Sequence, residues 1–239
     1  MLGRFLELGI AAGGIAESVQ FYERLGFSQL ITGDAWPHRY GVLSDGRLQL
    51  GLHERPMPSP ALTFVLPQLA RAQLRLRTAG FDLQQLSLGE DSLHQVQLCD
   101  PGGNAVTLLE ARTYSPPAPG SSLQSLCGYF SYLSLPQGDW QAAREFWERA
   151  GFVALGEEQL PYAHLPLTSD YLNLAFHAPR LFDAPLLVFE CADVSAHIAR
   201  LRERGIGLAT RLPRGLEHTH NALVSAPEGT ALLLVQSPD

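Results

Sequence analysis

The stretches ESVQFYERLGFSQL, residues 17–30, and AAREFWERAGFVAL, residues 142–155, decide the fold because they repeat one pattern. Each stretch predicts the end of an amphipathic helix, a glycine stop and an apolar strand. Phe21 and Phe146 occupy matching places and lie 146 − 21 = 125 positions apart in a chain of 239 residues. The sequence therefore predicts two copies of one architecture.

The repeat extends along both halves of the chain. QLARAQLRLRTAGFDL, residues 68–83, matches DVSAHIARLRERGIGL, residues 193–208. LCDPGGNAVTLL, residues 98–109, matches VSAPEGTALLLV, residues 224–235. These matches place every predicted element of the first half in the second.

The segment TYSPPAPGSSLQS, residues 113–125, lies between the two copies and has the Pro, Gly and Ser content of a linker. We predict two domains, residues 1–112 and 126–239. Each domain divides into two modules with the order strand, helix and three strands, and their ranges are 1–55, 60–112, 126–179 and 184–239.

The first module illustrates this order. An apolar strand is expected over 4–12, a helix with apolar residues at 3–4-residue spacing follows, and three short strands lie near 27–32, 38–44 and 47–53. One helix covers only one face of such a sheet. Two modules side by side would curl into a half-barrel with helices outside and a cleft inside. The predicted class is α+β, with four βαβββ modules.

The composition argues against several classes of protein. Apolar residues make up 46% and charged residues 17%, which is typical of a globular chain. No run approaches the roughly 18–20 apolar residues that span a bilayer. A net charge of −7 disfavours a nucleic-acid surface. Three scattered cysteines predict neither disulfides nor a metal knuckle, so we expect a cytoplasmic protein.

Together, FYERLGF, LRTAGF and the DPGGNAVTLLE hairpin, in this order and repeated, resemble the vicinal oxygen chelate superfamily. That group includes glyoxalase I, extradiol dioxygenases, bleomycin-resistance proteins and related lyases and epimerases. The resemblance covers about 4–111 and 127–237. It implies tandem glyoxalase-like domains and, in the metalloenzymes of the group, a divalent ion that leaves open positions for two adjacent substrate oxygens.

The resemblance also implies where the metal ligands would lie, in the first and last strands of each module. Counting from the helix motifs gives two positions per module, namely Glu7, Gln49, Ala61, Thr107, Tyr132, Asn173, Leu186 and Leu233. Few of these side chains bind a hard cation well. We therefore predict no metal and no cofactor. The alternative is a divalent ion held by Glu7, Gln49 and His53.

Two matching segments combine aromatic and imidazole groups. DAWPHRYG, residues 34–41, contains Trp36, His38 and Tyr40, and QLPYAHLP, residues 159–166, contains Tyr162 and His164. These rings would stack on or hydrogen-bond a planar ligand. Ordinary packing around Pro37 and Pro161 is the competing interpretation.

Glu7 and Glu190 are the candidate catalytic residues, since a buried carboxylate in an apolar strand can act as an acid or base. The competing interpretation of Glu190 is a salt bridge, for example to Arg211. The predicted ligand-binding set is Glu7, Trp36, His38, Tyr40, Gln49, Thr107, Tyr132, Tyr162, His164 and Asn173.

Three functional hypotheses remain open at this stage. The first is a protein that binds a small planar or cationic organic molecule without a complete metal site. The second is a metal-dependent lyase, isomerase or extradiol-type dioxygenase. In the third, the second half is a structural partner whose cleft is filled by its own side chains. The expected partner is a small molecule rather than a nucleic acid or membrane, and the expected state is a monomer or homodimer.

Overall fold

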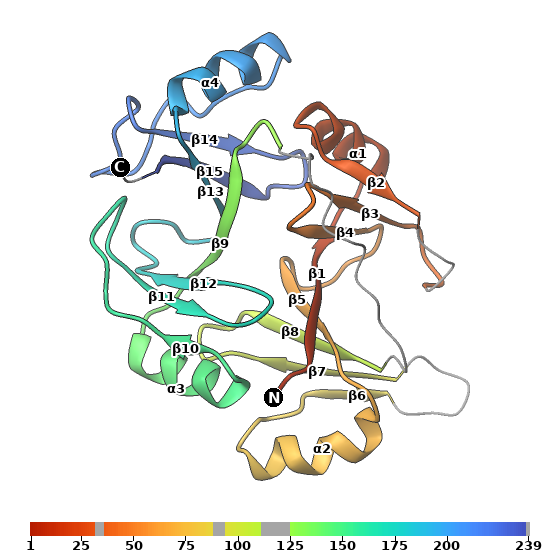
Figure 1. Ribbon diagram of the computed structural model, residues 1–239. Coiled ribbons are helices and arrows are strands. Elements are labelled where there is room, and N and C mark those ends of the chain that lie inside the picture. The colour runs from red at the N-terminus through yellow and green to blue at the C-terminus, as the bar shows by residue number, and fades with distance from the viewer. Residues whose placement is uncertain (32–35, 88–93, 111–124, 238–239) are drawn as a thin grey trace.

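The computed structural model describes residues 1–31, 36–87, 94–110 and 125–237, and they form two mixed sheets with four helices (Figure 1). The elements of the first half are β1 (Arg4–Ala11), α1 (Ile15–Arg24), β2 (Ser28–Leu30), β3 (Tyr40–Ser44), β4 (Gln49–His53), β5 (Ala61–Val65), α2 (Leu69–Thr78), β6 (Gln85–Ser87), β7 (Gln95–Cys99) and β8 (Ala105–Leu109). Those of the second half are β9 (Tyr129–Pro136), α3 (Trp140–Ala150), β10 (Val153–Ala154), β11 (His164–Thr168), β12 (Leu174–His177), β13 (Leu186–Cys191), α4 (Val194–Glu203), β14 (Asn221–Ser225) and β15 (Ala231–Gln236).

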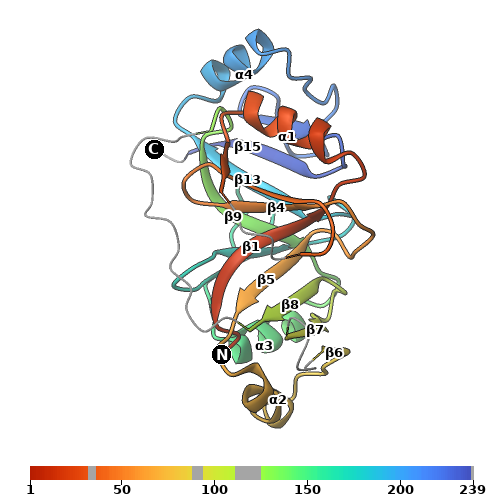
Figure 2. The same ribbon diagram turned by 90° about the vertical axis from the view of Figure 1, so that its right-hand side faces the viewer.

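Each sheet joins the two modules of one half. The strand orders are β2-β3-β4-β1-β5-β8-β7-β6 and β10-β11-β12-β9-β13-β15-β14. The modules meet where β1 pairs antiparallel with β5 and where β9 pairs antiparallel with β13. The helices lie at the periphery of the molecule and the sheets lie between them (Figures 1 and 2). The predicted α+β fold of curved sheets with helices outside is confirmed.

The fourth module differs from the predicted strand order. Residues 206–220 form no strand between α4 and β14, so only two strands follow this helix. Pro213 within the segment has no amide hydrogen for a strand ladder. A single backbone bond, from Ala209 N to Leu223 O at 2.8 Å, ties this segment to the strand that follows.

The repeated helix ends as its sequence predicts. Gly26 and Gly151 have φ angles of +90° and +109°, the left-handed backbone that a glycine adopts readily after a helix. Helix α3 begins at Asp139, whose carboxylate accepts a hydrogen bond from Ala142 N at 3.0 Å. Phe146 and Trp147 of this helix are buried in the core, where the Phe146 ring meets the Phe81 ring of the first half at 5.2 Å.

Two equivalent hydrogen bonds join the halves, each from a helix of one half to a hairpin of the other. Tyr22 of α1 donates a hydrogen bond to Glu228 of the β14–β15 hairpin at 2.7 Å. Trp147 of α3 donates to Asp100 of the β7–β8 hairpin at 3.2 Å. Figures 1 and 2 show α1 beside the β14–β15 hairpin. The core is therefore continuous between the halves. The predicted linker, 113–125, lies almost wholly outside the described residues, so the domain division stays a prediction.

No helix among the described ranges is long and apolar enough to cross a bilayer.

Candidate functional site

A row of polar side chains crosses the first sheet on the face opposite the helices. Gln97 lies opposite Thr107, Thr107 opposite Thr63, and Thr63 opposite Glu7 in the strand register. Their strand neighbours, such as Leu62 and Val106, point into the core beneath the helices, so alternation turns this row to the concave face. Glu7, Thr63 and Thr107 are all buried.

The matching row of the second sheet is almost wholly apolar. Leu223 lies opposite Leu233, Leu233 opposite Val188, and Val188 opposite Tyr132. Leu233 and Val188 belong to a buried cluster that also contains Leu186. The second concave face is therefore filled by its own side chains, as the third hypothesis expects.

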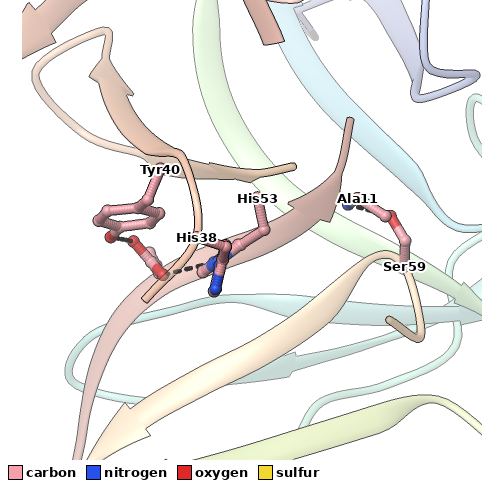
Figure 3. Close-up of polar contacts among 6 residues, drawn as sticks. Ala11, His38, Tyr40, His53 and Ser59 are labelled. Atoms are coloured by element: carbon pink, nitrogen blue, oxygen red, sulfur yellow. Dashed lines mark hydrogen bonds and ion pairs between the residues drawn. The ribbon is translucent and has the colours of Figure 1, made fainter. Parts of the chain in front are cut away.

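Glu7 is the centre of the polar cluster on the first concave face. Its side chain is 1% exposed. Tyr40 donates a short hydrogen bond to Oε2 of this carboxylate. His53 Nε2 lies 3.4 Å from Oε1, and its other ring nitrogen, Nδ1, lies 3.0 Å from Nε2 of His38 (Figure 3). Within the described part of the chain, Oε1 accepts no hydrogen bond.

One glycine makes room for this cluster. A Cβ atom at Gly51 would overlap the Glu7 carboxyl group. A Cβ atom at Gly9, in contrast, would lie 3.6 Å from His53 Nε2, an ordinary contact. Glycine inside a strand often marks a close approach. The residue type at position 51 thus leaves space for the Glu7 carboxyl group inside the sheet.

The loops around the cluster are also fixed by contacts. Ser59 Oγ accepts a hydrogen bond from Ala11 N at 3.1 Å, which ties the segment after β4 to the end of β1 (Figure 3). The half-buried Trp36 ring lies 5.4 Å from the His53 ring. The guanidinium of Arg55 lies 5.4 Å from the centre of the Trp36 ring. Aromatic and cationic groups therefore border the buried carboxylate.

His38 connects this buried cluster to solvent, since its side chain is only half-buried. Partial burial lowers the pKa of His38, and the nearby charges of Arg55 and His53 lower it further. One nitrogen of the His38–His53 pair donates and the other accepts, and the tautomers decide which one donates. The two imidazole rings thus form a chain of contacts from the half-buried His38 to the Glu7 carboxylate.

In the second half, the histidine equivalent to His53 forms hydrogen bonds to neighbouring protein groups through both ring nitrogens. His177 is opposite His164 just as His53 is opposite Tyr40. His177 Nδ1 lies 2.7 Å from Ser134 Oγ, and its Nε2 donates to the Phe182 carbonyl at 3.0 Å. Burial lowers the pKa of His177 to about 4. This histidine is a neutral structural residue.

Tyr132 takes the place of Glu7 in the second sheet. Its ring stacks on His164 at 5.4 Å. The hydroxyl groups of Tyr132 and Tyr162 are buried and have no hydrogen-bond partner in the described ranges. Burial raises the pKa of both phenols. His164 itself bonds the Tyr162 carbonyl through Nδ1 at 2.8 Å.

The predicted site residues thus divide into groups. The structure brings together the first-half set of Glu7, Trp36, His38, Tyr40 and His53. A second set, Tyr132, Tyr162 and His164, packs in the second half. The predicted roles of both sets stay predictions.

Two other predicted residues share the first sheet with Glu7. Half-buried Gln49 begins β4, and Thr107 lies two strands from Glu7. Asn173 is exposed and accepts a hydrogen bond from Thr168 at 2.8 Å. Glu190 accepts one from Ser131 at 2.7 Å, and no ion pair with Arg211 occurs in the described structure. Two cavities, of about 610 and 670 Å³, are lined by none of the predicted residues.

No family model and no curated protein sequence matches the chain, whereas solved structures share its fold. A 2,3-dioxygenase from Pseudomonas sp. KL28 matches 99% of this chain and 92% of its own, with 12% identity and a TM-score of 0.64. A homoprotocatechuate 2,3-dioxygenase from Brevibacterium fuscum matches 99% of this chain and 72% of its own, with 14% identity and a TM-score of 0.65.

The chain has the vicinal oxygen chelate fold. A variant of 4-hydroxymandelate synthase from Streptomyces coelicolor also matches, at 14% identity and a TM-score of 0.62, over 98% of this chain and 92% of its own. The vicinal oxygen chelate fold therefore occurs with more than one reaction among these structures, and at such identities the likeness shows the fold alone.

The prediction of no cofactor is wrong. The solved structures that share the fold over the whole chain are mostly extradiol dioxygenases, from the branch for which the resemblance implied a divalent ion. The approach of His53 to Glu7 is not visible in the sequence. Nε2 of His53 lies 3.4 Å from Glu7 Oε1, the spacing of two ligands around one tetrahedral ion.

The residues present do not complete a metal site, however. No group of three His, Cys, Asp or Glu side chains in the described ranges could hold an ion. Glu7 and His53 supply two donors at the first concave face. At the second, the equivalent positions hold Tyr132 and a histidine bonded by Ser134 and a backbone carbonyl.

Proposed function

We propose that the chain binds a small planar organic molecule at the first concave face and that Glu7 is the residue that recognises it. One observation supports this proposal above the others: Glu7 Oε1 is buried and accepts no hydrogen bond in the described structure. A buried carboxyl oxygen that accepts no hydrogen bond is costly, and a ligand or ion would complete it. Glu7 is therefore the group to test first.

The surroundings of Glu7 indicate the chemistry of the ligand. An N–H, an O–H or a positive charge on the ligand would satisfy Oε1. The half-buried Trp36 and Tyr40 rings offer flat apolar surface next to it. A planar molecule that carries a cationic or hydrogen-bond-donating group matches both features. All of these groups come from one chain, so we propose that a monomer, or each copy in a homodimer, binds independently.

The same cluster would support acid–base chemistry on the bound molecule. Glu7 would accept a proton from the ligand, and the His53–His38 pair would exchange it with solvent. Tyr40 would hold the carboxylate in place through its hydrogen bond to Oε2. In this proposal Glu7 is the base, and Glu190, bonded to Ser131 in the second half, takes no part.

The binding proposal is tested with a pair of flat probes. 9-Aminoacridine is a planar cation at neutral pH and acridine is its largely neutral parent, and both are measured by fluorescence titration. We expect 9-aminoacridine to bind more tightly, and Glu7→Gln to weaken its binding roughly tenfold, because a charged partner is lost. The matched control is Tyr132→Phe, the equivalent position of the second half. Equal binding to Glu7→Gln and the unaltered chain would contradict the proposal.

A second candidate function is metal-dependent conversion of a substrate with two adjacent oxygens. The 3.4 Å spacing of Glu7 Oε1 and His53 Nε2 favours it, as do the dioxygenase structures that share the fold. Metal analysis of protein purified without chelator tests this function, with absorbance titration of 4-nitrocatechol as a second readout. Stoichiometric metal that is lost in both Glu7→Gln and His53→Gln supports it. Retention of the metal in both variants contradicts it.

A further inference from the structure

The cavity of about 610 Å³ shares no lining residue with the Glu7 cluster and is lined by residues of both halves. Its floor is apolar and buried, with Val65 and Leu66 from the end of β5 and Leu76 from α2. Tyr171, from the turn between β11 and β12 of the second half, borders it. A volume of this size is typical of sites for small organic molecules.

Two arginines line this cavity together with its apolar residues. Arg4, at the start of β1, places its guanidinium 4.9 Å from the centre of the Tyr171 ring. Arg75 projects from α2 and also lines the cavity. Within the described residues, neither guanidinium forms an ion pair with a carboxylate. Both guanidinium groups are therefore free to meet an anion in this cavity.

Packing restricts the position of Arg4, whereas Arg75 is exposed on α2. Gly3 has a φ angle of +96°, and a Cβ atom there would overlap the Val65 carbonyl, so the chain crosses close to β5 just before Arg4. The aromatic ring beneath Arg4 restricts its guanidinium through a cation–π contact. Ala72, on the same helix as Arg75, is buried and small, which keeps the cavity open on that side.

We infer that this cavity binds a small organic anion, an aromatic or alkyl carboxylate whose apolar body lies on the floor and whose carboxylate meets Arg4 and Arg75. Arginine pairs well with carboxylates because its planar fork matches both oxygens. The inference is independent of the function proposed for the Glu7 cluster, because the two sites share no residue. Binding there would also join the two halves through Tyr171.

The test is a fluorescence titration with 2-naphthoate, and 2-naphthamide serves as the neutral probe of the same shape. We expect naphthoate to bind more tightly than the amide and its affinity to fall as sodium chloride is added. Arg75→Gln and Arg4→Gln should each weaken naphthoate binding roughly tenfold, the usual effect of losing a hydrogen bond to a charged group. Arg77→Gln is the matched control, because Arg77 is exposed on the same helix and does not line the cavity.

Equal affinity for naphthoate and naphthamide would overturn the inference, as would equal losses in Arg77→Gln and Arg75→Gln. The salt dependence uses the unaltered protein, so it decides the question even if Arg4→Gln unfolds. Naphthoate binding should be unchanged in Glu7→Gln, which separates this cavity from the first concave face. Binding that is lost in Glu7→Gln but kept in both arginine variants would place the anion elsewhere and contradict the inference.

Discussion

Glu7 and Tyr132 occupy equivalent positions in the two sheets, opposite Thr63 and Val188 respectively, yet their surroundings differ. Glu7 meets Tyr40 and His53 in a polar cluster. Tyr132 stacks on His164 beside an apolar cluster. The duplication therefore preserved the sheet while one half kept a charged group on its concave face and the other half packed that face with its own side chains.

The fit of Glu7 over Gly51 gives the first prediction. Gly51→Ala places a methyl group inside the volume of the carboxyl group, so we expect unfolding to become easier by about 1–3 kcal/mol. Gly41→Ala is the control, because its nearest neighbour would be Ile15 Cδ1 at 3.8 Å, an ordinary contact. Urea denaturation measures both variants. Equal stability of Gly51→Ala and Gly41→Ala would show that the site is looser than described.

The contact between Tyr22 and Glu228 gives the second prediction. Tyr22→Phe removes one of the two donors to this carboxylate, the other being Ser18 at 2.6 Å. We expect a loss of about 1–2 kcal/mol in the free energy of unfolding. The double variant Tyr22→Phe/Glu228→Gln should lose less free energy of unfolding than the two single variants lose together, because the two residues interact. If the losses of the two single variants simply add up in the double variant, the hydrogen bond between the halves does not contribute to stability, which would contradict the account.

The buried His177 gives the third prediction, on pH. Its pKa is lowered to about 4 in the folded protein, so the unfolded chain binds the extra proton first as the pH falls. The stability that His177 contributes is complete above about pH 6.5 and is lost as the pH falls toward 4. The total loss is on the order of 3 kcal/mol.

The measurement is the free energy of urea unfolding at several pH values between 7 and 4. His177→Gln keeps a donor for the Phe182 carbonyl but cannot titrate, so its stability should depend less on pH in this window. His218→Gln, an exposed position in a turn, is the control and should keep the full slope. Identical slopes in all three proteins would contradict the role given to His177.

Local patterns predicted most of the fold. The glycine stops and the apolar periodicity predict the four helices and most strands to within a few residues, while the division into domains stays a prediction. The missing strand in 206–220 was not predicted, since apolar residues continue through that segment and a single proline gives a weak signal. Pairing of modules within each half depends on the contact between β1 and β5, which no local pattern encodes.

The site was less predictable than the fold. The predicted residues Glu7, Trp36, His38 and Tyr40 lie together in the structure, while their roles stay predictions. The space for the Glu7 carboxyl group depends on Gly51, and a glycine within a predicted strand was the available signal for it. The contact of Asp100 with Trp147 and the cavity beside Arg4 join segments of different halves, so sequence spacing contains no information about them.

The stability of Glu7→Gln tests the central claim most directly. If Glu7 serves a ligand rather than the fold, the amide keeps the hydrogen bond from Tyr40, removes the buried carboxyl oxygen that accepts no hydrogen bond and offers an N–H toward His53. Urea unfolding should then show equal or greater stability than the unaltered chain, by up to about 1 kcal/mol. A loss of several kcal/mol would show that the carboxylate holds the first sheet together and would contradict the account.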